Sequence, residues 1–186
     1  GWDIIDPVAV ELLEAERFGF QEHQWHSQPI VGGNAVTEPG TRNQINVVNP
    51  AKPDDLVGFV TEASAEDIET AITSAQNGYI AWSKTSPEER AAVLRKVGDL
   101  MEEHAAELFS LTTREAGKTM LDAVGELREA VDFARFYAAE ALRNADAGEA
   151  RGVITCISPW NFPLAIFSGQ VLAALAAGNA VLAKPA

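Results

Sequence analysis

Residues 153–163 read VITCISPWNFP, and this stretch decides the fold of the chain. Its first five residues are apolar or β-branched, which is typical of a strand buried on both faces. A helix of small and apolar residues begins at Pro163 and ends at the Gly178–Asn179 pair. Residues 180–183 (AVLA) predict a second buried strand. A strand, a helix and a strand at this spacing predict a right-handed βαβ unit of a parallel sheet.

The residues before this unit predict a small sheet near the amino end. Residues 29–34 predict a strand that runs into a turn, and residues 44–48 and 56–60 predict two further strands. Together they predict a small antiparallel sheet. Residues 8–16 predict a short helix ahead of it.

Three helices are predicted between this sheet and residue 144. Each begins at a hydroxyl residue that is followed three positions later by an acidic one, an arrangement that caps a helix start. The capping residues are Ser64, Ser86 and Thr119. The second helix or its continuation ends at Gly117, which suits a left-handed cap. The inner face of the third helix is predicted to hold Val124, Leu127, Val131, Ala134 and Ala138.

Composition excludes several classes of protein. The chain has 186 residues, 47% of them hydrophobic, and a formal net charge of −13. Such an acidic chain is a poor partner for nucleic acid or an anionic membrane. The apolar residues 163–183 are interrupted by Gly169 and Gly178, so no membrane span is expected. His23 and His26 have no cysteine near them, so no metal site is expected either.

The single cysteine, Cys156, leaves no partner for an intramolecular disulfide. This fits a reducing compartment, and the absence of a secretory signal leads us to expect a cytoplasmic protein. Because Cys156 lies inside a predicted strand, it is interpreted as packing rather than as a nucleophile.

Two polar residues follow the predicted parallel strands. Asn161 lies on the turn after the first strand, and Lys184 follows the second. Ligands of parallel sheets bind beyond the carboxyl ends of the strands, so both residues are expected to border one crevice. The amide of Asn161 could stabilise an oxyanion, but asparagine is also a preferred helix N-cap. Lys184 could bind a phosphate or a sugar hydroxyl, or could simply be solvated.

Several runs together resemble the aldehyde dehydrogenase superfamily. They are VVNP (47–50), EAGK (115–118), ISPWNFP (157–163), AGN (177–179) and KPA (184–186), in this order and spacing. The resemblance implies an α/β fold. Residues 1–27 would form a lead segment, and residues 28–186 would form the N-terminal part of the NAD-binding domain, with an incomplete parallel sheet. It also accounts for the absence of a G-x-G-x-x-G fingerprint, because that family binds NAD without one.

Within the superfamily, CISPWNFPLAIF (156–167) and the short linker 143–152 are similar to the bacterial bifunctional proline-utilisation enzymes. This similarity implies the NAD-dependent oxidation of L-glutamate γ-semialdehyde, the hydrolysed form of 1-pyrroline-5-carboxylate, to L-glutamate in proline catabolism. FAD would be needed only if the parent protein has an upstream proline dehydrogenase domain. The parent is expected to be a homo-oligomer. Two alternatives stay open: a dehydrogenase for another aldehyde, and a non-catalytic assembly module.

The resemblance also implies a role for each residue of the signature. Asn161 would be catalytic, holding the oxyanion, and Phe162 would form a wall of the aldehyde pocket. The cofactor side would be lined by Ile157, Ser158, Pro159, Trp160 and Lys184. The nucleophilic cysteine and the water-activating glutamate of the family belong further along the chain. The 186 residues are therefore expected to be a fragment that is inactive by itself.

Overall fold

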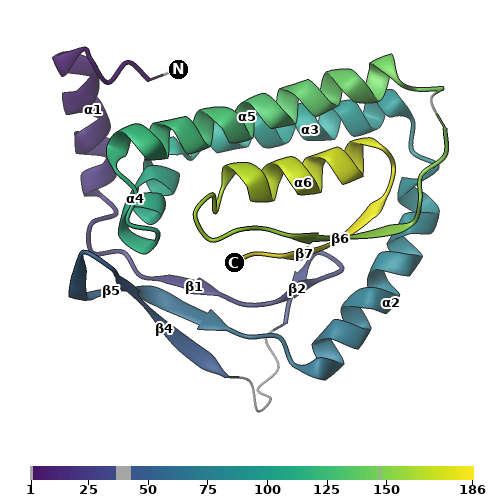
Figure 1. The fold of residues 1–186 in the computed structure, drawn as a ribbon, viewed down its shortest axis with the longest axis horizontal. Coiled ribbons are helices and arrows are strands. Elements are labelled where there is room, and N and C mark those ends of the chain that lie inside the picture. Colours follow the sequence, from purple (N-terminus) through teal and green to yellow (C-terminus); the bar gives the residue numbers. More distant parts are fainter. Residues whose placement is uncertain (1, 37–42, 147) are drawn as a thin grey trace.

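The computed structural model describes residues 2–36, 43–146 and 148–186 of the chain. Within these ranges the elements run, in chain order, α1 (Pro7–Phe18), β1 (Trp25–Ser27), β2 (Ile30–Val31), β3 (Asn34–Ala35), β4 (Gln44–Asn49), β5 (Lys52–Thr61), α2 (Ala65–Trp82), α3 (Pro87–Glu103), α4 (Ala105–Glu115), α5 (Met120–Arg143), β6 (Val153–Ile157), α6 (Ala165–Ala176) and β7 (Ala180–Lys184). This mixture of helices and strands confirms the predicted α/β class (Figure 1).

Helix α6 lies at the centre of the region that carries the predicted site. Helices α3 and α5 run side by side along one side of it, and β6 and β7 lie along its other side (Figure 1). Helix α2 also contacts β6 and β7, while α1 packs against α4. None of the helices in the described ranges has the length and apolar character needed to cross a membrane.

Two clusters of buried side chains hold the helices together. One joins α1, α4 and α5 around Phe109 and Leu127, both fully buried. The other joins α3, α5 and α6 around Leu94 and Leu172. The residues predicted for the inner face of α5 are each at most 3% exposed, which confirms that face: Val124, Leu127, Val131, Ala134 and Ala138.

The βαβ unit is present as predicted. Strands β6 and β7 pair in parallel, with Val153 opposite Ala180 and Ile157 opposite Lys184. The prediction that both strands are buried on both faces is wrong, because only Cys156 in β6 and Ala180 in β7 are buried. Thr155, Ala183 and Lys184 are exposed and Ile157 is 64% exposed, so the described residues leave much of the two strands uncovered.

Asn179 fixes the start of this unit. Its side-chain Oδ1 accepts hydrogen bonds from the backbone N–H groups of Arg151 (2.6 Å) and Gly152 (3.1 Å). Its Nδ2 donates to the carbonyl of Ala174 at 3.2 Å. One buried side chain therefore joins the end of α6 to the segment that enters β6.

The amino-terminal sheet differs from the expected one. Strands β4 and β5 form the predicted antiparallel pair, but the third strand is β1, which runs parallel to β5. Residues 29–34, predicted as a strand that runs into a turn, form part of the small hairpin β2–β3 and do not join β4 and β5. Gly32 and Gly33 both have positive φ (58° and 83°), which is the conformation of a tight hairpin turn. The predicted turn is therefore confirmed, and the prediction is wrong only in placing the strand before it in the sheet with β4 and β5.

The predicted helix starts are confirmed. Ser64 and Ser86 form capping boxes, and the hydroxyl of Thr119 accepts from the N–H of Asp122 at 3.2 Å. Gly117 has the expected left-handed conformation, with φ at 64°. The helix after Ser86 is nevertheless split at His104, whose backbone (φ −96°, ψ 21°) ends α3 and begins α4.

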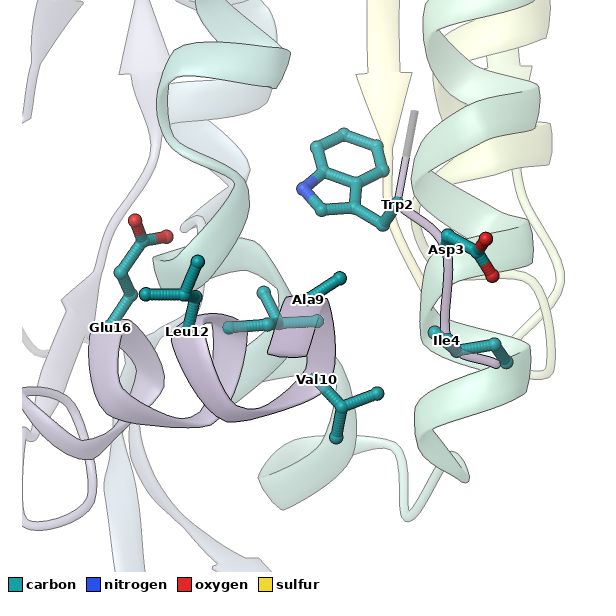
Figure 2. A pocket seen from close by; sticks show the side chains of 8 residues that line it. Trp2, Asp3, Ile4, Ala9, Val10, Leu12 and Glu16 are labelled. Carbon is teal, nitrogen blue, oxygen red and sulfur yellow. The ribbon is translucent and has the colours of Figure 1, made fainter. Parts of the chain in front are cut away.

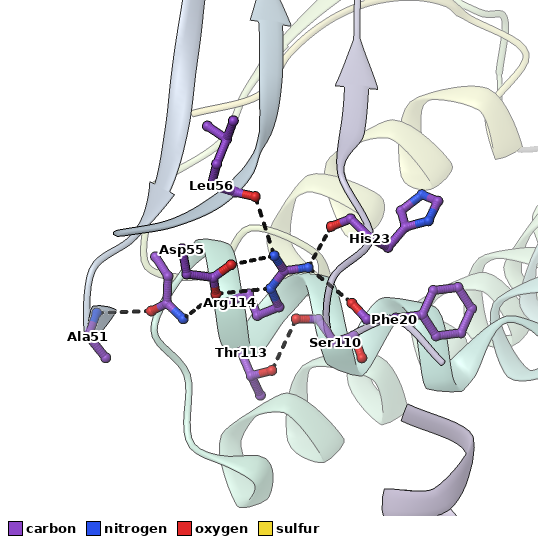
Figure 3. A network of polar contacts seen from close by, with 9 residues as sticks. Phe20, His23, Ala51, Asp55, Leu56, Ser110, Thr113 and Arg114 are labelled. Carbon is purple, nitrogen blue, oxygen red and sulfur yellow. Dashed lines mark hydrogen bonds and ion pairs between the residues drawn. The ribbon is translucent and has the colours of Figure 1, made fainter. Parts of the chain in front are cut away.

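Arg114 ties the amino-terminal segment to the body of the fold (Figure 3). Its side chain is 10% exposed and donates to both carboxylate oxygens of Asp55 in β5. It also donates to the carbonyls of Phe20 and His23, at 3.0 and 2.7 Å. The guanidinium carbon lies 5.3 Å from the centre of the Trp25 ring. A single side chain thus holds α4, β5 and the connection between α1 and β1 together.

Candidate active site

The signature run forms the turn between β6 and α6. Trp160 is 77% exposed, Phe162 is 39% exposed and Asn161 is also exposed. Ser158, at the start of the turn, is only 7% exposed. The turn therefore presents a polar amide between two aromatic side chains at the surface.

The ends of the two parallel strands lie directly beside each other. Ile157 is opposite Lys184, and the N–H of Ser158 donates to the carbonyl of Lys184 at 3.3 Å. This pairing brings Ile157 and Ser158, which are predicted to line the cofactor, next to Lys184, which is predicted to bind its ribose. Asn161 lies further along the turn, and its side chain forms no hydrogen bond with any described residue.

The N-terminus of α6 is not capped by Asn161. The N-cap residue is Leu164, which has no capping side chain, so the alternative interpretation of Asn161 as a cap is wrong. The cap comes instead from Glu126 in α5. Its Oε2 accepts from the N–H groups of Leu164 (3.2 Å) and Ala165 (2.9 Å). The Asn161 amide is consequently left available for a ligand.

Lys118 completes this arrangement from the segment before α5. Its Nζ lies 3.2 Å from Oε1 of Glu126 and 4.8 Å from the centre of the Phe162 ring. Glu126 is 3% exposed and the side chain of Lys118 is 17% exposed, so the ion pair is nearly buried. A cation at this distance from an aromatic face is attracted to it. The pair therefore contacts the signature turn at both Phe162 and the start of α6.

Glu126 and Lys118 were not among the predicted site residues. Lys118 belongs to the EAGK run, but nothing in that run points toward Phe162. The sequence did contain a signal for Glu126, which is an acidic residue between Ala123 and Leu127 on the apolar inner face of α5. A carboxylate on such a face needs a partner, since a buried charge is stable only when it is paired.

The residues predicted to line the cofactor have the surface that a polar ligand needs. The hydroxyl of Ser158 is buried and has no hydrogen-bond partner among the described residues, although buried polar groups are normally satisfied. Exposed Ile157 and Trp160 lie beside it in the chain, and the Lys184 ammonium group forms no ion pair with a described residue. An orphaned hydroxyl, a free cation and apolar surface together suit a dinucleotide.

Cys156 has the character that was predicted. It is 4% exposed within β6, and burial raises the pKa of its thiol. A raised pKa reduces the thiolate fraction, and the thiolate is the nucleophilic form. Burial and a raised thiol pKa are the features of a packing cysteine, in line with the prediction.

Two hollows of the described surface lie away from the signature turn. One, of about 230 Å³, lies between residues 2–4 and α1, and Trp2, Ile4, Leu12 and Glu16 are among the residues that line it (Figure 2). The other, an open hollow of about 580 Å³, lies on α5 around Phe133 and Phe136. Neither is lined by a predicted site residue.

The chain is similar to known proteins in its sequence. Residues 36–186 match the model of the aldehyde dehydrogenase family. The bifunctional protein PutA of Klebsiella aerogenes is 44% identical over 189 residues, which cover 100% of this chain and 14% of PutA. The alpha-ketoglutaric semialdehyde dehydrogenase of Bacillus subtilis is 39% identical over 77% of this chain and 32% of its own length.

A solved structure agrees with these sequence relatives. The 1-pyrroline-5-carboxylate dehydrogenase from Thermus with bound NAD superposes with a TM-score of 0.91 and 29% identity, over 100% of this chain and 39% of that one. The chain thus spans well under half the length of these relatives. The predicted resemblance is confirmed over most of the sequence, and the chain belongs to the aldehyde dehydrogenase family.

Proposed function

We propose that this chain supplies the oxyanion-binding residue and part of the NAD site of an NAD-dependent aldehyde dehydrogenase that is longer than the 186 residues. The observation that carries the proposal is the free, exposed amide of Asn161 on a turn whose following helix is capped from another helix. A donor held in place in advance stabilises the negative oxygen that develops when a nucleophile adds to an aldehyde.

The cofactor would lie against the ends of β6 and β7. Lys184 would bind a ribose hydroxyl, and Ile157, Ser158, Pro159 and Trp160 would line the adjoining surface. The orphaned hydroxyl of Ser158 supports this placement, because a bound ligand would give it a partner. When bound, NAD would accept the hydride that the aldehyde loses on oxidation. Phe162 would form a wall of the aldehyde pocket beside Asn161.

The proposed substrate is L-glutamate γ-semialdehyde, formed from 1-pyrroline-5-carboxylate, and the proposed product is L-glutamate. The support comes from the likeness to PutA and to the Thermus 1-pyrroline-5-carboxylate dehydrogenase. The second candidate is the semialdehyde of another dicarboxylic acid. It is favoured by the 39% identity to an alpha-ketoglutaric semialdehyde dehydrogenase.

The decisive experiment measures NAD reduction by the full-length protein with a panel of aldehydes, comparing it with its Asn161→Ala variant. Loss of one oxyanion donor is expected to lower kcat by about 10²–10³-fold. Asn46→Ala, an exposed asparagine on β4, is the matched control and should leave kcat unchanged. An unaltered kcat in Asn161→Ala would refute the oxyanion role. A protein that oxidises no aldehyde would instead favour the assembly module.

The setting of the enzyme is part of the same proposal. We expect a cytoplasmic homo-oligomer, and the single buried thiol of Cys156 fits a reducing compartment. Cell fractionation and the molecular mass of the full-length protein in solution would test these two expectations.

A further inference from the structure

The carboxylate of Glu126 has all its contacts within one small region. One oxygen accepts from the N–H groups of Leu164 and Ala165, and the other pairs with Lys118. The residue is 3% exposed, so water contributes little to its solvation. Every described partner of this buried charge therefore either begins α6 or contacts the turn before it.

Helix α6 has no charge of its own to stabilise its start. Its sequence is AIFSGQVLAALA, with no acidic residue in the first turn and no side-chain bond from its N-cap residue. A helix N-terminus has unsatisfied N–H groups and a partial positive charge, and a carboxylate satisfies both. Glu126 supplies that carboxylate from α5, so the start of α6 depends on a residue outside the helix.

The position of the cap determines the position of the turn. Leu164 and Ala165 follow the signature residues directly, so holding their amides fixes where the turn ends. Lys118 contacts the same turn through its ammonium group, which lies over the Phe162 ring. The left-handed backbone of Gly117 directs the chain into this position just before α5 begins.

We infer that Glu126, paired with Lys118, is a positioning residue that clamps the 158–165 turn so that the Asn161 amide meets the developing oxyanion. Glu126 does not touch the substrate in this scheme and acts through the turn. The inference rests on the proposed role of Asn161. A displacement of about 1 Å in a reacting group can cost about 10²-fold in rate, so a loosened turn should be visible in kcat.

The kinetic test uses the full-length protein with Glu126→Ala, Asn161→Ala and the double variant. Glu126→Ala is expected to lower kcat by about tenfold to a hundredfold with little change in the KM for NAD. If Glu126 acts through Asn161, the double variant will be no slower than Asn161→Ala alone. If the fold losses in kcat of the two single variants multiply in the double variant, Glu126 acts independently of Asn161, and the inference is overturned. Glu129→Ala, an exposed glutamate on the same helix, should leave kcat unchanged.

A conservative variant separates the proposed role of Glu126 from the effect of misfolding. Glu126→Gln keeps an oxygen that can accept from the two amides, but it places an amide beside the Lys118 cation instead of a carboxylate. It is expected to fold and to lose kcat severalfold, less than Glu126→Ala, with the same non-additivity toward Asn161→Ala. A normal kcat in Glu126→Gln would overturn the role of the pair.

The hold of Glu126 on the start of α6 can also be tested by an experiment that does not measure enzyme activity. Hydrogen exchange at the amides of Leu164 and Ala165 should be faster in Glu126→Ala than in the parent protein, while exchange in the middle of α5 stays the same. Unchanged exchange at these two amides would refute the clamp itself. A normal kcat in Asn161→Ala together with faster exchange would refute the proposed oxyanion role and leave the clamp standing.

Discussion

Arg114 and Asp55 form a two-pronged ion pair, with Nη2 2.6 Å from Oδ1 and Nε 3.2 Å from Oδ2. Their side chains are 10% and 19% exposed, so water screens the pair only partly. Arginine suits this geometry because its planar group matches the two oxygens of a carboxylate. The pair joins α4 to β5, and the same guanidinium group bonds the carbonyls of Phe20 and His23.

Replacing Arg114 should therefore destabilise the fold. Arg114→Ala leaves the Asp55 carboxylate and the carbonyls of Phe20, His23 and Leu56 without this donor, and a loss of about 3 kcal/mol in the free energy of unfolding is expected. Arg114→Lys keeps the charge but cannot form the fork, so it should recover only part of this loss. Denaturant unfolding measures both variants against Arg95→Ala, an exposed arginine on α3. If Arg114→Ala lowered the free energy of unfolding no more than Arg95→Ala does, the Arg114 network would not stabilise the fold.

The same pair predicts a pH dependence of stability. The hydrogen bond from Arg114, followed by that from Asn49, holds the pKa of the Asp55 carboxyl below its ordinary value of 3.8. A group with a lowered folded-state pKa stabilises the fold above its ordinary pKa, and this contribution is lost as the pH falls through the lowered value. The unfolding free energy should therefore fall more steeply in the parent than in Asp55→Asn between about pH 5 and about pH 2. Parallel pH curves for the two proteins would contradict this prediction.

The sequence predicted the parts of the fold that depend on local chemistry. Ser64, Ser86 and Thr119 begin helices because each side chain bonds to a backbone group only three residues away. The β6–α6–β7 unit could be predicted for a similar reason. Its apolar runs, and the glycine that ends α6, follow one another directly along the chain. Such features need no knowledge of distant residues.

Distant contacts account for what the sequence did not predict. Strand β1 is short and pairs with β5 across more than thirty residues, so no local pattern marks it. The break at His104 contains neither glycine nor proline. In the candidate site, the sequence located the turn with Asn161, but the residue that caps α6 lies on another helix, 38 positions before Leu164.

Lys184 is expected to contribute cofactor affinity rather than turnover. Its side chain is exposed at the end of β7 and has no charged partner among the described residues, so Lys184→Ala should fold normally. Loss of one charged hydrogen bond should raise the dissociation constant for NAD about tenfold or more. Titration of NAD into the full-length protein measures this, with Lys96→Ala, an exposed lysine on α3, as the control. Equal NAD affinity in Lys184→Ala and the parent would remove the proposed ribose contact.

Asn179 should prove more important for stability than its place in a turn suggests. Its side chain is 6% exposed and bonds to three backbone groups, those of Arg151, Gly152 and Ala174. In Asn179→Ala the two N–H groups lose their acceptor, and because they are only part-buried the loss is expected to cost about 1 kcal/mol each.

The matched control is Asn144→Ala, which removes an exposed asparagine that bonds only to Glu140 one turn earlier. That change should cost less than about 0.5 kcal/mol. Hydrogen exchange gives the location of the effect, because in Asn179→Ala the amides of Arg151 and Gly152 should exchange faster while those in the middle of α5 do not. Equal stability of the two variants would mean that the β6–α6–β7 unit does not depend on this side chain for its start.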